Sequence, residues 1–138
     1  MKKFKNKNLT ASSKSWITRQ FSDPYIKLAK QKGYRSRSAF KLIEINKKFK
    51  FLKNNLNIID LGSAPGGWSQ VCSEINKNGK NLSIDILDMN KIDNIFFYKK
   101  NFNDVDFLDF VNSFFDRNKV DIVLSDMAVN TTGNKDLD

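Results

Sequence analysis

The fold of this chain is decided by the stretch Asp60-Leu61-Gly62-Ser63-Ala64-Pro65-Gly66-Gly67-Trp68. It follows an apolar run and precedes a segment of helical spacing, so it predicts a sharp turn from a strand into a helix. Its glycines allow a bulky ligand to lie against the backbone near the helix N-terminus, and a nucleoside-type cofactor is the natural occupant. The spacing differs from the dinucleotide-binding Gly-x-Gly-x-x-Gly pattern and lacks the Gly-Lys-Ser/Thr ending of phosphate-binding loops. Considered alone, the stretch also fits a turn without a ligand.

Short apolar runs alternate with helical stretches around this turn. We expect strands at residues 56–61, 82–87, 95–97 (or slightly longer) and 120–124. A first helix should be capped by Asp23 and Pro24 and end at Gly33, and a second should carry Phe40 to Phe49 with Lys41 near its start. Two more are expected at residues 68–75 and around residues 107–115. This alternation predicts an α/β fold, a mostly parallel sheet with flanking helices.

The length and composition favour one domain with a short arm. The chain has 138 residues, of which 1–15 are polar and charged and are expected to form a flexible basic arm, with the domain at 16–138. Cys72 is the single cysteine and there is no histidine, so neither an internal disulfide nor a zinc site of the usual ligands is expected. No apolar run approaches the roughly 20 residues of a membrane span. We expect a cytoplasmic monomer without a metal.

The charge is concentrated in the first third of the chain. Residues 1–50 hold 15 basic and 2 acidic side chains, whereas residues 51–138 hold 9 basic and 13 acidic ones, within a total of +9. A segregated basic surface favours a polyanion such as RNA, although a merely lysine-rich composition is the alternative. The candidate RNA-binding residues are Lys27, Lys30, Lys32, Arg35 and Arg37.

Polar residues follow three of the expected strands. Asp85 lies near the end of the second strand, Asn101 follows the third, and Asp126 follows the fourth. Open parallel sheets bind ligands outside the carboxyl ends of their strands, where an acidic side chain such as Asp85 commonly accepts hydrogen bonds from ribose hydroxyls. Each carboxylate alone fits a solvated loop residue, but their shared placement with the glycine-rich turn favours a ligand site.

Three motifs resemble the FtsJ-type family of ribosomal RNA large-subunit methyltransferases, the methyltransferase E group. The first is Lys32-Gly33-Tyr34-Arg35-Ser36-Arg37-Ser38-Ala39-Phe40-Lys41-Leu42-Ile43-Glu44-Ile45, preceded by Ser22, Asp23 and Tyr25. The second is the turn with its helix, residues 60–70. The third is Ser125-Asp126-Met127-Ala128, followed by Asn130 and Gly133. The likeness runs from about residue 13 to residue 138.

The resemblance implies a Rossmann-like class I fold and S-adenosylmethionine as cofactor. It implies methylation of the 2′-oxygen of a uridine in 23S ribosomal RNA within the large ribosomal subunit. The family's catalytic set is Lys-Asp-Lys-Glu, and the matching motifs assign its first lysine to Lys41 and its aspartate to Asp126. The implied cofactor contacts are Gly66, Trp68, Asp85, Asn101 and Asp126. Asn101 stands where the family usually has Asp, and Val129 replaces the usual proline.

The resemblance also implies that part of the domain lies beyond this sequence. The family's second catalytic lysine and its glutamate are expected after residue 138, so we expect the chain to hold the domain only to about the fourth strand, which would lie at an uncovered sheet edge. The alternative function is a non-catalytic RNA- or ribosome-binding remnant that keeps the cofactor loop. A dinucleotide-dependent oxidoreductase is disfavoured by the glycine spacing.

Overall fold

The computed structural model describes residues 23–127, so the expected arm at residues 1–15 lies outside the described residues. A four-stranded sheet has the order β3-β2-β1-β4, and each neighbouring pair is parallel. The strands are β1 (Asn57–Leu61), β2 (Lys80–Asp85), β3 (Phe96–Lys99) and β4 (Ile122–Ser125). The helices are α2 (Pro24–Lys32), α3 (Ser38–Phe49), α4 (Gly67–Ile75) and α5 (Phe107–Phe114). This topology confirms the predicted α/β fold.

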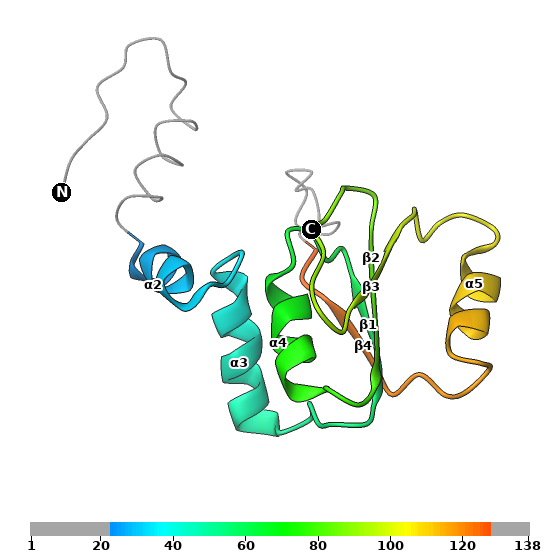
Figure 1. Ribbon diagram of the computed structural model, residues 1–138, viewed down its shortest axis with the longest axis horizontal. Helices are drawn as coiled ribbons and strands as arrows, with labels where there is room; N and C mark the ends of the chain where they lie inside the picture. Colours follow the sequence, from blue (N-terminus) through cyan, green and yellow to red (C-terminus); the bar gives the residue numbers. More distant parts are fainter. Residues whose placement is uncertain (1–22, 128–138) are drawn as a thin grey trace, which may run out of the picture.

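Helices cover both faces of the sheet. Figure 1 shows α2, α3 and α4 on one side and α5 on the other. Successive residues of β1 point to opposite faces, so Ile58 packs with Leu42, Trp68 and the other buried residues under α3 and α4, while Ile59 packs with Phe115 under α5. The central strand therefore contributes to two separate hydrophobic cores.

The ends of α2 are formed as the sequence predicts. The Asp23 carboxylate accepts a 2.8 Å hydrogen bond from the Tyr25 backbone N–H, and Pro24 occupies the first helical position. Gly33 ends the helix in the left-handed region, at φ 78°. These caps fix where the chain leaves α2 and enters the link to α3.

The strand limits differ from the predicted ones, most clearly in the second strand. That strand was expected at 82–87, but β2 is Lys80–Asp85, and Ile86 and Leu87 are 61% and 62% exposed. The Asp85 carboxylate accepts a 3.0 Å hydrogen bond from the Leu87 backbone N–H, which turns the chain out of the sheet. Apolar character alone therefore placed the end of this strand too late.

The third and fourth strands begin and end later than predicted, while the first differs by one residue at its start. As expected, β4 lies at an edge of the sheet, within the range 23–127. In the same range, none of the helices is long and apolar enough to cross a membrane.

Candidate functional site

The glycine-rich turn between β1 and α4 lies at the carboxyl edge of the sheet. The backbone N–H groups of Gly62 and Ser63 both donate to the Ile84 carbonyl of β2, at 2.8 and 3.2 Å. Gly62 has φ 69°, and the Met127 side chain packs where its Cβ would lie. Gly66, at φ 123°, precedes the first residue of α4. Glycine is therefore required at both positions, by backbone conformation and by close packing.

A cavity of about 190 Å³ opens inside this turn. It is lined by residues of the turn, by Ser36 of the α2–α3 link, by Ser38 at the start of α3, and by Asp60 and Asp126. Ser63 lines the same cavity, and its side-chain oxygen, which is buried, has no hydrogen-bond partner among the described residues. A buried unpaired hydroxyl favours a ligand that supplies the missing partner.

Asp60 is the most perturbed acid of the site. Only 3% of the residue is exposed, and burial raises the pKa of its carboxyl from 3.8 to about 7, an effect increased by the negative charges of Asp126 and Asp85. A 2.7 Å hydrogen bond from the Ser69 hydroxyl acts in the opposite direction on this pKa. The negative charges of Asp126 and Asp85 thus both act on Asp60, which favours a cationic ligand in the cavity.

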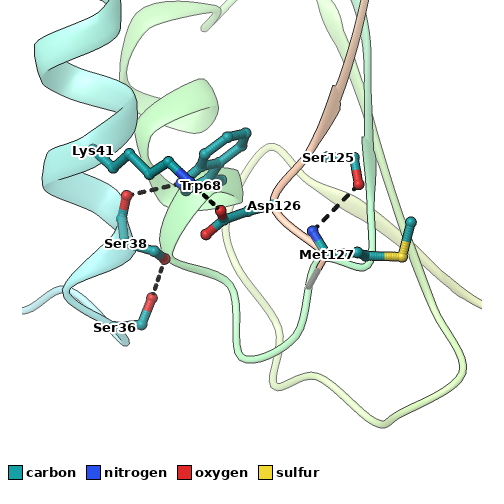
Figure 2. Close-up of polar contacts among 7 residues, drawn as sticks. All are labelled: Ser36, Ser38, Lys41, Trp68, Ser125, Asp126 and Met127. Carbon is teal, nitrogen blue, oxygen red and sulfur yellow. Dashed lines mark hydrogen bonds and ion pairs between the residues drawn. The ribbon is translucent and has the colours of Figure 1, made fainter. Parts of the chain in front are cut away.

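The two predicted catalytic residues meet at the mouth of this cavity. Figure 2 shows Lys41 of α3 reaching Asp126 at the end of β4, with 2.9 Å between Nζ and the carboxylate. The ammonium group also lies 5.9 Å from the centre of the Trp68 ring, whose Nε1 donates a 2.8 Å hydrogen bond to the Ser38 carbonyl. Trp68 therefore packs α4 against α3 directly beside the ion pair.

A second, larger pocket adjoins the first and includes Lys41 in its lining. Its volume is about 400 Å³, and Lys41, Arg37, Tyr25 and Asp126 are among its lining residues. Ser38 and Asp126 line both pockets. The ion pair therefore lies where a small acidic cavity meets a larger pocket that is lined by residues of both charges.

The other expected cofactor contacts occupy different positions. Asp85 holds the turn from the adjacent strand, because its carboxylate accepts a 2.8 Å hydrogen bond from the Ala64 backbone N–H. Asn101 is exposed in the segment after β3, and its side-chain oxygen accepts a 2.9 Å hydrogen bond from the Asn103 backbone N–H. Of the expected site residues, Trp68 and Asp126 line the cavity and Lys41 pairs with Asp126, whereas the lining does not include Gly66, Asp85 or Asn101.

The expected RNA-binding residues fall into two groups. The α2 lysines, Lys27, Lys30 and Lys32, are exposed. Arg37 is also exposed, pairs with Asp23, and lies 5.7 Å from the Tyr25 ring centre. Arg35 instead directs its guanidinium at backbone carbonyls. Four of the five cations therefore lie on the surface, and one is used within the fold.

Two residues of the site were not singled out from the sequence, Asp60 and Ser63. Both belong to the stretch 60–68. The position of Asp60 at the end of a buried strand was the feature of the sequence that could have indicated its role. The unpaired hydroxyl of Ser63 had no signal beyond its place in the turn. The described residues contain no cluster of three or more His, Cys, Asp or Glu side chains arranged to hold a metal ion.

Comparison with known proteins places the chain among methyltransferases. Residues 34–138 match the FtsJ-like methyltransferase family. The ribosomal RNA large subunit methyltransferase E of Pelagibacter ubique is 48% identical over 126 residues, covering 91% of this chain and 62% of that protein. The enzyme of the same name from Rickettsia akari is 45% identical over 139 residues, covering 96% and 61%. The chain thus spans less than two thirds of these relatives.

A solved structure agrees with the sequence matches. A Plasmodium falciparum protein described as a ribosomal RNA methyltransferase superposes with a TM-score of 0.62 and 43% identity. The match covers 76% of this chain and 62% of the other.

Proposed function

Since the chain belongs to the FtsJ-like methyltransferase family, we propose that it forms the cofactor-binding part of a cytoplasmic enzyme that methylates ribosomal RNA. In this proposal the methyl donor is S-adenosylmethionine, and the acceptor is the ribose 2′-hydroxyl of a uridine in the 23S RNA of the large ribosomal subunit. The observation that carries the proposal is the acidic cavity inside the glycine-rich turn with the Lys41–Asp126 ion pair at its mouth.

The residues of the cavity fit a positively charged nucleoside. The carboxylates of Asp60 and Asp126 line it, and their mutual repulsion with Asp85 would be relieved by a sulfonium ion. Among the described residues the Ser63 hydroxyl has no hydrogen-bond partner, and the glycines leave room for a ligand against the backbone. Asp85 is the candidate for the ribose hydroxyls, since each carboxylate oxygen retains a lone pair beyond its backbone hydrogen bond.

Bound S-adenosylmethionine would supply an electrophilic methyl group, so the protein's task is to place the acceptor oxygen in line with it. The larger pocket is the candidate position of the acceptor ribose, because it shares Ser38 and Asp126 with the cavity. Lys41 carries a charged donor at this boundary, and Asp126 holds it by the 2.9 Å ion pair. We assign orientation of the ribose oxygen to Lys41, and positioning of Lys41 to Asp126.

The RNA would lie across the exposed face of α2. The α2 lysines and Arg37 are the candidate phosphate contacts, and Arg37 also lines the pocket beside Lys41. Cations of this kind bind phosphates without reading sequence. Choice of the methylated nucleotide is therefore assigned to other contacts within the ribosomal subunit.

Calorimetric titration with S-adenosylmethionine tests the cofactor assignment. Replacing Asp85 by Ala should weaken binding about tenfold or more, the effect of removing hydrogen bonds to a charged group. Asp88→Ala is the matched control, because Asp88 is an exposed aspartate three positions away, paired with Lys99 at 3.1 Å. The control should bind as the unchanged chain does, and nicotinamide adenine dinucleotide should not bind.

Transfer is tested separately, with tritium-labelled methyl donor and large subunits from cells lacking the methyltransferase. Label in a uridine 2′-O-methyl group of the large-subunit RNA would support the substrate assignment. A chain that binds no S-adenosylmethionine would overturn the cofactor proposal. An equal dissociation constant for Asp85→Ala and the control would remove Asp85 from the site.

A further inference from the structure

Arg35 occupies an unusual position for a cation in a basic segment. Its guanidinium donates to the backbone carbonyls of Pro65, Asn90 and Lys91, at 3.1, 2.6 and 2.8 Å. Pro65 belongs to the glycine-rich turn, while Asn90 and Lys91 belong to the segment between β2 and β3. One side chain therefore joins two loops that are separated in the sequence by α4 and β2.

The rest of Arg35 is fixed as well. Its backbone N–H donates a 2.8 Å hydrogen bond to the side-chain oxygen of Gln70 in α4, and the Gln70 amide donates to the Gly33 carbonyl at 3.0 Å. The Arg35 stem packs on Gly66, where an added Cβ would lie 3.2 Å from its Cδ and 2.9 Å from Ile92. The absence of a side chain at Gly66 thus admits both Arg35 and the neighbouring loop.

We propose that Arg35 is a positioning residue for the cofactor, and that it acts by clamping the 62–67 turn to the 86–95 loop that follows Asp85. This rests on the function proposed above. Hydrogen bonds from a charged planar donor are stronger and more directional than those between neutral groups. Arg35 thus joins two segments that are close to proposed cofactor contacts. Gly66 lies within the 62–67 turn, and Asp85 directly precedes the 86–95 loop.

These contacts give Arg35 a different role from that of the surface cations near it. The three carbonyls occupy three of the five guanidinium N–H groups and hold the side chain toward the two loops, which leaves two N–H groups for any other acceptor. Arg37, two residues further on, makes no such contact with the turn and lies over Tyr25 beside Asp23. Two arginines of one short link would therefore serve different ligands, Arg35 the methyl donor and Arg37 the RNA.

Hydrogen exchange and binding on the whole chain test the clamp with three variants. In Arg35→Ala, amides of residues 62–67 and 86–95 should lose protection in the cofactor-free protein, while those within β1 and α3 keep theirs. The dissociation constant for S-adenosylmethionine should rise about tenfold or more, and affinity for a large-subunit RNA fragment should stay unchanged. Arg35→Lys should recover part of both effects, because an ammonium cannot reach all three carbonyls.

Arg37→Ala should show the opposite pattern, with weaker RNA binding and unchanged loop protection. If Arg35→Ala lost protection throughout the chain, Arg35 would have a general structural role and the proposal would be overturned. The proposal would also be overturned if Arg35→Ala kept normal protection in both loops but bound RNA more weakly. Failure of the unchanged chain to bind S-adenosylmethionine would count against the proposed function alone. The exchange pattern of the cofactor-free variants would still decide whether Arg35 clamps the two loops.

Discussion

Replacing Asp60 by Asn should stabilise the protein above neutral pH and make its stability less dependent on pH. The pKa of the Asp60 carboxyl lies at about 7 in the fold, against an ordinary value of 3.8. Each pKa unit corresponds to about 1.4 kcal/mol, so ionising the Asp60 carboxyl in the folded protein lowers the free energy of unfolding by about 4 kcal/mol.

The sign follows from the raised pKa. Below about pH 4 both states carry a protonated Asp60 and no stability is lost, whereas between about pH 4 and pH 7 only the unfolded state ionises freely. Stability from this group is therefore lost as the pH rises to about 7. An Asn side chain cannot ionise, but it keeps an oxygen that accepts the hydrogen bond from the Ser69 hydroxyl.

Urea denaturation at about pH 5 and about pH 8 measures the effect. The stability difference between Asp60→Asn and the unchanged chain should grow by about 2 to 3 kcal/mol across this interval, in favour of the variant. Groups that do not interact with Asp60 titrate equally in both proteins and cancel in the comparison. A difference that is the same at both pH values would refute the reasoning, because it would mean that Asp60 ionises alike in both states.

Three further predictions concern packing, reactivity and charge. Gly62→Ala should destabilise the fold by about 2 to 4 kcal/mol in thermal denaturation, from its left-handed backbone and overlap with Met127, and Met127→Ala should recover part of the loss. The Cys72 thiol, whose pKa burial raises to about 12, should resist Ellman's reagent at about pH 8 in the folded protein and react once denaturant is added. Replacing the α2 lysines together by Ala should lower the salt dependence of RNA binding, reducing the log–log slope by about 2 to 3; an unchanged slope would place the RNA elsewhere.

The fold was largely predictable because its signals are local. Asp23 and Gly33 cap α2 at the expected residues, and the alternation of apolar runs with helical spacing gave all four described strands. The limits of β2 were missed because an apolar pair, Ile86 and Leu87, continues past the point where Asp85 turns the chain. A hydropathy pattern cannot predict a side-chain hydrogen bond that ends a strand.

The site was predictable where a motif fixed it and less so elsewhere. Lys41 and Asp126 are separated by 85 residues, and only the family motifs indicated that they belong together. Their contact depends on β4 pairing beside β1, which local periodicity does not encode. The role of Arg35 was hidden for a similar reason, since no local pattern distinguishes an arginine that faces carbonyls from one that faces solvent.

The position of β4 links the two halves of the proposed activity. Within residues 23–127 this strand is hydrogen-bonded only to β1, whereas the glycine-rich turn is held by β2, Asp85 and Arg35. Local opening of β4 would carry Asp126 away from Lys41 and Met127 away from Gly62. Because Asp126 lines both pockets, loosening this strand would weaken cofactor retention and acceptor alignment together.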